Sequence, residues 1–143
     1  MSVAPSLSVT MRVTVYVPPE EYLSEFSSRR EAFDYNLSAN YISPSKEEVE
    51  VFRRLYEGEV RYTDKCTGEF LHYLEDRGFM EDSLILLMAD HGHAFMEHER
   101  FGHAYDILYN EVIHVPLIMF GLNKVGKTDA KVSLLDVPPT ILK

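Results

Sequence analysis

The sequence has no tryptophan and a single cysteine, Cys66, among 143 residues. One cysteine cannot form a disulfide within the chain, and its presence is neutral about the cellular compartment. Basic residues are also scarce, because 14 Lys and Arg stand against 23 Asp and Glu, a net charge of −9. Neutralising phosphates needs a basic face, so this balance argues against nonspecific nucleic-acid binding.

Long apolar runs are missing as well. No stretch of the chain approaches the roughly 20 apolar residues that a membrane helix needs. The N-terminal sequence MSVAPSLSVTMRV holds no basic region followed by an apolar core, which is the pattern of a secretory signal peptide. We therefore expect a cytoplasmic protein with no membrane partner. The remaining composition, 45% apolar and 26% charged, is ordinary for one globular domain with a hydrophobic core.

The N-terminal part predicts a strand followed by short helical segments. Valines and Met11 alternate with polar residues over 9–17, which indicates a half-buried or edge strand. Pro18 and Pro19 end this strand, and Pro19 can begin a short helix over 20–26. Residues 27–40 are polar and weakly patterned, so we expect a surface connection with some helix.

A long amphipathic helix is predicted from about Lys46 to Arg77. Ser45 and Glu48 have the spacing of a capping box at its start, and Gly78 can end it. Apolar residues recur at helical spacing along this stretch, namely Val51, Leu55, Tyr62, Cys66, Phe70 and Leu74.

Two apolar runs, 84–89 and 115–120, predict buried strands. Strand 9–17, the long helix and strand 84–89 together suggest a right-handed crossover. Between the two runs, 105–111 predicts a short helix. After them, 131–135 predicts a short strand, and Asp136 is positioned to cap a last helix that has Pro138 and Pro139 in its first turn.

The best candidate site follows the apolar run 84–89, where Asp90, His91 and Gly92 begin a segment that holds four of the six histidines. In open α/β sheets, ligands collect at the carboxyl ends of strands. Asp beside His suits a divalent ion such as Mn, Zn or Mg. Taken alone, however, such a pair is more often a turn cap and a packed histidine. His91, His93 and His98 fit no closed structural zinc pattern.

Five ordered segments change this balance. The chain carries YEGEVRYTD at 56–64, DSLILLMADHG at 82–92, EHERFGH at 97–103, YNEVIHVPLI at 109–118 and VSLLDVPPTIL at 132–142. With PPEEY at 18–22, they resemble motifs of the sulfatase family in the alkaline-phosphatase-like superfamily. The resemblance covers residues 18–142 and not 1–17, so residues 1–143 are interpreted as a single partial sulfatase-like domain.

The resemblance implies an α/β fold with a three-layer, alkaline-phosphatase-like sheet flanked by helices, here truncated. It implies that Asp90 and His91 are ligands of a divalent metal ion. Many sulfatases have Asn at the second position and bind calcium, whereas His leaves Ca, Mn, Mg and Zn all open. His103 falls where the family places a Lys or His that contacts the sulfate or phosphate of the substrate and its leaving group. A donor there would stabilise negative charge on the ester oxygens.

The chain also departs from the family. The family nucleophile lies upstream in Cys/Ser-x-Pro-x-Arg and is converted to formylglycine, but Cys66 is followed by Thr-Gly-Glu-Phe. The paired Asp residues that complete the metal site are absent too, and Val13 stands where an upstream His is expected. The resemblance therefore implies the C-terminal part of a catalytic domain that is inactive alone.

Three functions stay open. The first is a metal-dependent, arylsulfatase-like sulfuric ester hydrolase, or a fragment of one, whose partner is a small sulfate or phosphate ester. The second is a phosphatase, phosphodiesterase or phosphonate hydrolase of the same superfamily. The third is a noncatalytic truncated domain that binds a metal or a partner. Because a truncated sheet leaves unpaired edges, self-association is expected of such a truncated domain.

Overall fold

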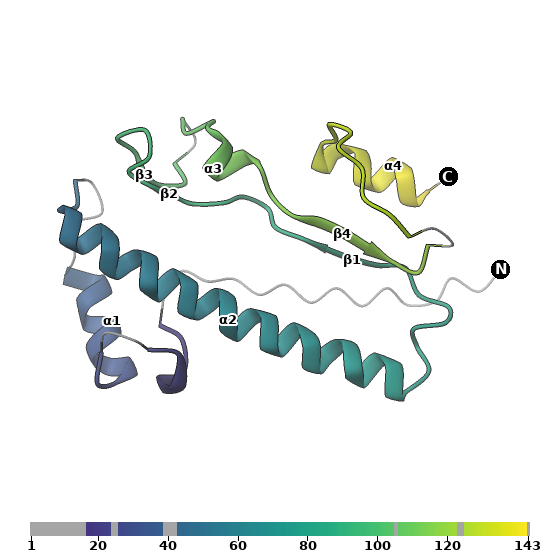
Figure 1. The fold of residues 1–143 in the computed structure, drawn as a ribbon, viewed down its shortest axis with the longest axis horizontal. Coiled ribbons are helices and arrows are strands. Elements are labelled where there is room, and N and C mark those ends of the chain that lie inside the picture. Colours follow the sequence, from purple (N-terminus) through teal and green to yellow (C-terminus); the bar gives the residue numbers. More distant parts are fainter. Residues whose placement is uncertain (1–16, 24–25, 39–42, 105, 123–124, 143) are drawn as a thin grey trace. The chain divides into compact units, whose positions relative to one another are not determined.

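The computed structural model describes residues 17–23, 26–38, 43–104, 106–122 and 125–142. Figure 1 shows the helices and strands in chain order, coloured from purple at the N-terminus to yellow at the C-terminus. The chain divides into two compact units, residues 1–66 and 67–143, and the division falls within the long helix α2. The strand predicted over 9–17 lies, except for its last residue, outside the described residues.

Helix α2, Lys46–Asp76, confirms the long helix predicted from the sequence. The capping box is present at its start: the Ser45 N–H donates to Glu48 Oε2 at 2.7 Å, and the Glu48 N–H donates to Ser45 Oγ at 3.2 Å. At the other end Gly78 adopts φ +70°, which glycine accepts without steric cost. The Phe79 N–H then donates to the Leu74 carbonyl at 2.9 Å, as in a Schellman motif.

The first unit combines the N-terminal part of α2 with helix α1, Arg29–Ser38, and a 3-10 turn at Glu20–Tyr22. The helix predicted over 20–26 is thus only this turn, because Leu23 is already extended. Pro18 and Phe52 are fully buried in this unit.

Val17 is held at both of its backbone polar groups. Its N–H donates to Glu59 Oε1 of α2 at 3.0 Å, and its carbonyl accepts from Arg29 Nη2 of α1 at 3.2 Å. Burial raises the pKa of the Glu59 carboxyl, while the Val17 N–H and the charge of Arg29 oppose that rise. The chain therefore enters Pro18 from a position that two helices fix.

The second unit contains two small antiparallel sheets. Strand β1, Ile85–Met88, pairs with β4, Leu117–Phe120, and strand β2, Ala94–Phe95, pairs with β3, Phe101–Gly102. Helices α3, Asn110–Ile113, and α4, Val137–Ile141, belong to the same unit. Among the described residues of this unit, Ala94, Ile107 and Val112 form a buried core cluster.

Strands β1 and β4 lie at the predicted positions, but the prediction that they are buried was wrong. Leu87 and Met88 are each 38% exposed, and Ile118 is 45% exposed. Continuous apolar runs predict burial when layers cover both faces of a sheet. Among the described residues this ladder has only two strands, so each is an edge. The ladder is antiparallel, and the other strand of the predicted crossover, 9–17, lies outside the described residues except for Val17.

Two further expectations in this unit were wrong, and a third was confirmed in part. The helix predicted over 105–111 begins only at Asn110, and residues 131–133 form no strand and lead into a 3-10 turn at Leu134–Asp136. The predicted last helix is present as α4 with Asp136 at its N-cap position, but the Asp136 carboxylate accepts from the Ser133 N–H at 2.7 Å and so caps the 3-10 turn. The Ser133 hydroxyl accepts the Leu135 N–H at 3.3 Å, and this local hydrogen bond to the following backbone competes with strand formation. In the described ranges, moreover, no helix is long and apolar enough to cross a membrane. The secondary structure that remains is a mixture of helices and small antiparallel sheets, consistent with an α/β class.

Candidate functional site

Asp90 and His91 follow β1 after one intervening residue, as the sequence predicted. The Asp90 side chain is 90% exposed and that of His91 43% exposed. Asp90 Oδ1 accepts the His91 N–H at 2.9 Å, so the carboxylate is folded back over its own turn. The other oxygen, Oδ2, faces the imidazole.

The hydrogen bond of His91 determines which ring nitrogen is left to bind a metal ion. His91 Nδ1 lies 2.8 Å from the Gly92 carbonyl oxygen, which can only accept, so Nδ1 carries the proton. His91 Nε2 lies 3.8 Å from Asp90 Oδ2. Two ligands of one divalent ion are separated by roughly 3 to 4 Å, given metal–ligand bonds of about 2.0–2.6 Å. The pair therefore fits two positions of a metal coordination shell.

This pair is not a complete metal site. Over the residues whose placement is described, no group of three or more His, Cys, Asp and Glu side chains is arranged to hold an ion. Two protein ligands leave most of the coordination shell of a divalent ion to other donors.

Gly92 is packed against helix α3. Its N–H donates to the Val112 carbonyl at 2.7 Å. A Cβ added at Gly92 would lie 2.1 Å from the Glu111 carbonyl oxygen, which no side chain tolerates. The close approach of the two backbones thus requires glycine at this position. Helix α3 thereby supports the turn that carries Asp90 and His91.

His103 lies against the candidate metal ligands. Its ring stacks on that of His91 with centroids 4.1 Å apart and an angle of 18° between the planes. Burial and the charge of His91 lower the pKa of His103, while Asp90 acts in the opposite sense. The structure therefore brings together the three residues Asp90, His91 and His103 that the sequence singled out.

His93 is half-buried and packs on aromatic rings. Its centroid is 4.6 Å from that of Phe95 and 5.2 Å from that of Phe101, the latter edge to face. Burial first, and then the charges of His103 and His91, lower the pKa of His93 to about 4. His93 is therefore neutral at pH 7 and part of the aromatic packing.

The loop between β2 and β3 has a constrained tip. Met96 and Glu99 adopt positive φ values of 71° and 56°, which side chains other than glycine rarely accept. The Met96 N–H donates to the Arg100 carbonyl at 2.8 Å and closes the loop. Glu97 Oε2 accepts the Phe95 N–H at 2.5 Å, so this carboxylate stabilises the loop.

His98, at this tip, makes contacts that sequence reasoning missed. Its Nδ1 lies 2.5 Å from Glu111 Oε1, and its ring stacks on Tyr109 with centroids 3.8 Å apart and planes at 6°. The partners are 13 and 11 positions away, so no local pattern signals the pairing. Glu97-His98 and Tyr109-Asn110-Glu111 both lie in the motif segments described above, and this was the signal available.

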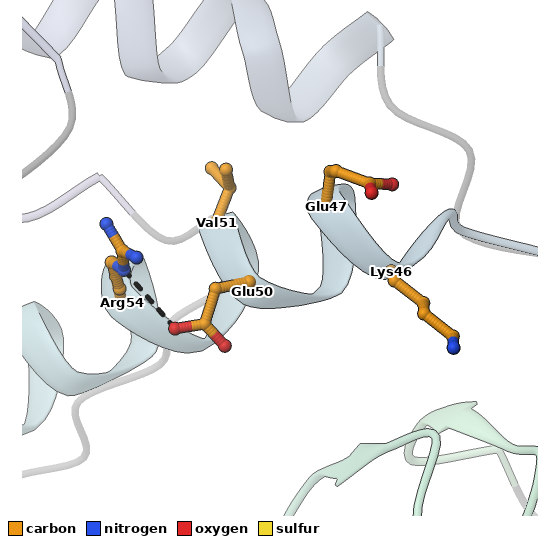
Figure 2. Close-up of a pocket in the computed structure, with 5 residues that line it drawn as sticks. All are labelled: Lys46, Glu47, Glu50, Val51 and Arg54. Carbon is orange, nitrogen blue, oxygen red and sulfur yellow. Dashed lines mark hydrogen bonds and ion pairs between the residues drawn. The ribbon is translucent and has the colours of Figure 1, made fainter.

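A separate shallow recess lies over the first turns of α2 (Figure 2). Figure 2 shows that its walls come from one helix, and the dashed line marks the contact of Arg54 Nε with Glu50 Oε1 at 3.3 Å. The lining residues are Lys46, Glu47, Glu50, Val51 and Arg54. An exposed ion pair of this kind contributes little to stability. None of the candidate site residues lines this recess.

Comparison with known proteins gives matches to one family and its superfamily. A family model described as Sulfatase matches residues 14–143. The chain is 35% identical over 101 residues to Arylsulfatase K of Gallus gallus and 33% identical to that of Homo sapiens, each match covering 68% of this chain and 18% of the relative. It is 31% identical over 120 residues to the multifunctional alkaline phosphatase superfamily protein PehA of Trinickia caryophylli, covering 80% of this chain and 23% of that protein.

The chain thus spans about a fifth of the length of these curated relatives. No solved structure matches it. The family model covers most of the chain, and several relatives exceed 30% identity over two thirds of it. The chain therefore belongs to the sulfatase family, within the alkaline-phosphatase-like superfamily.

Proposed function

We propose that this chain supplies part of the active site of a metal-dependent sulfuric ester hydrolase acting on a small sulfate ester. Asp90 and His91 would hold a divalent ion, and His103 would donate a hydrogen bond to the ester group. One observation carries the proposal: His91 Nε2 faces Asp90 Oδ2 at 3.8 Å while Nδ1–H is held by the Gly92 carbonyl. Metal-binding histidines usually donate their second ring N–H in this way, which fixes the tautomer.

A divalent ion bound there would act as a Lewis acid on the ester and stabilise the negative charge that develops. The residues of this chain have separate tasks. Asp90 and His91 orient the ion, and His103 can donate an N–H close to it because its ring stacks on His91 at 4.1 Å. A donor aimed at the leaving oxygen lowers the cost of charge separation.

The nucleophile of the proposed enzyme would come from a segment outside these 143 residues. Cys66 lacks the family's Pro and Arg neighbours, so formylglycine chemistry is not assigned to it. We extend the proposal to the fold: residues 1–143 would form one part of a three-layer, alkaline-phosphatase-like sheet. Further strands would then pair with β1 and β4, whose outer edges otherwise favour self-association. A cytoplasmic location is also proposed, and cell fractionation tests it.

Phosphate-ester chemistry is the second candidate. His91 occupies a position where many sulfatases have Asn, and the similar protein PehA is described as a multifunctional member of the alkaline phosphatase superfamily. The test uses the protein extended upstream through the family's nucleophile motif, assayed on an aryl sulfate and an aryl phosphate with matched leaving groups. We expect the sulfate to be preferred and both activities to be lost in Asp90→Ala. A preference for the phosphate would favour the second candidate.

If the extended protein binds a metal but hydrolyses neither ester, the noncatalytic alternative is favoured. Asp82→Ala is the matched control, because Asp82 is an exposed carboxylate that starts the same segment. Equal loss of activity in both variants would mean that Asp90 has no specific role.

A further inference from the structure

We propose that Glu111 is a positioning residue for the Asp90–His91 turn and for His103. It would act on the β2–β3 loop through His98 and on Gly92 through the backbone of α3. This inference rests on the proposed function, because it concerns how the proposed metal ligands are held. Glu111 itself would touch neither metal nor substrate.

The side chain of Glu111 fixes the tip of the β2–β3 loop. The side chain is only 17% exposed, and its Oε1 lies 2.5 Å from His98 Nδ1. The Tyr109 ring stacks on one face of the His98 ring, with centroids 3.8 Å apart. The imidazole is thus restrained both in its plane and from one face, by two residues that frame the start of α3. Hydrogen bonds that involve a charged group and are shielded from water are the stronger ones.

The backbone around Glu111 supports the metal turn. The carbonyl oxygen of Glu111 lies 2.1 Å from the position that a Cβ at Gly92 would take. The next carbonyl, that of Val112, accepts the Gly92 N–H at 2.7 Å. Val112 is also 6% exposed and belongs to the core cluster that includes Ala94 of β2. Helix α3 is therefore attached to the loop segment twice, through Val112 in the core and through Glu111 at the rim.

Two attachments determine the orientation of a short helix, whereas one allows it to pivot. Without the Glu111 carboxylate, α3 would keep its core contact at Val112 but lose the contact with His98. The loop tip would then rely on its own strained turn, since Met96 and Glu99 have positive φ values that side chains other than glycine rarely accept. His103 follows β3 directly, so movement of this loop would displace His103 from its stack on His91.

The test measures binding of Mn²⁺ alone to the full chain by calorimetry. We expect Glu111→Ala and His98→Ala each to weaken binding by roughly 3- to 10-fold, at or below the effect usual for groups behind a metal ligand. Because both changes remove the same contact, that between His98 and Glu111, the double variant should bind Mn²⁺ no more weakly than either single variant. Glu111→Gln keeps the size of the side chain and an acceptor oxygen, so it should recover most of the affinity. Glu81→Ala, an exposed glutamate of the same unit, is the control.

A second readout needs no metal. Amide hydrogen exchange at Gly92 should be faster in Glu111→Ala than in the parent chain and unchanged in Glu81→Ala. If the parent chain does not bind Mn²⁺, the exchange rate at Gly92 decides the inference, and the proposed metal site is tested with the other cations. If the parent chain binds Mn²⁺ and Glu111→Ala neither weakens binding nor accelerates exchange, the inference is overturned. Should Glu111→Ala not fold, His98→Ala and Glu111→Gln carry the same comparison.

Discussion

Replacing Gly92 with alanine is the most direct perturbation of the turn that carries the candidate ligands. The new Cβ would lie 2.1 Å from the Glu111 carbonyl oxygen and 3.3 Å from Val112 Cα. Both neighbours are backbone atoms of α3, so no side-chain rotation relieves the clash. The two segments must separate by about 1.3 Å before ordinary contact is restored, which close-packed interiors resist.

The expected cost has two parts. Separation breaks the 2.7 Å hydrogen bond from the Gly92 N–H to Val112, a loss of about 1 kcal/mol. It also displaces Val112, which is 6% exposed, from its core contacts, and overpacking of this kind costs about 1–3 kcal/mol. We therefore expect Gly92→Ala to destabilise this part of the second unit by about 2–4 kcal/mol.

Hydrogen exchange followed by mass spectrometry is the suitable assay, because the chain has no tryptophan and α2 dominates any signal from helix content. Peptides covering residues 84–95 and 106–115 should exchange roughly 30-fold faster or more, since each 1.4 kcal/mol corresponds to about a factor of ten. Gly126→Ala is the control, because nothing lies within 4 Å of a Cβ there. Equal protection in Gly92→Ala and the parent chain would refute the close packing of Gly92 on α3.

Three further expectations concern stability. In α2, Gly68→Ala should stabilise the protein by about 0.5–1 kcal/mol, since nothing lies within 4 Å of the added Cβ. Gly58→Ala should destabilise it, since the added Cβ would lie 2.7 Å from a backbone oxygen. Urea denaturation of the two variants checks this, and equal effects would contradict it. Glu59 has a raised pKa, so the stability it contributes is present at low pH and is lost as the pH rises through its folded-state pKa, above the ordinary 4.5. Glu59→Gln keeps an acceptor for Val17 and should gain stability relative to the parent chain as the pH rises to 7, and a constant difference would argue against the burial of that carboxylate. Glu99→Gly should stabilise by up to about 1 kcal/mol by removing the positive-φ strain, and thermal melts showing destabilisation would exclude that strain.

The features that sequence predicted well depend on near neighbours. The capping box of Ser45 and Glu48 and the glycine stop at Gly78 involve residues within five positions of each other, so local spacing was enough. The place of Asp90 and His91 after a strand was predicted for the same reason. The resemblance of the ordered motif segments then indicated the family, which the comparisons confirmed.

The features that sequence missed depend on contacts between distant segments. The exposure of β1 and β4 follows from how many layers cover them, which an apolar run does not encode. The pairing of His98 with Glu111 joins residues 13 positions apart, and each looks alone like an ordinary surface residue. Asp136 stands at the N-cap position of α4 as predicted, but its carboxylate accepts from the Ser133 N–H of the adjoining 3-10 turn.

The central claim is that Asp90 and His91 are ligands of one divalent ion. The most direct measurement is calorimetric titration of Ca²⁺, Mg²⁺, Mn²⁺ and Zn²⁺ into the full chain and into Asp90→Ala, with Asp82→Ala as the control. We expect at least one cation to bind the parent chain and the control equally and to lose binding in Asp90→Ala. Absence of binding by all four cations, or binding that Asp90→Ala leaves unchanged, would contradict the claim.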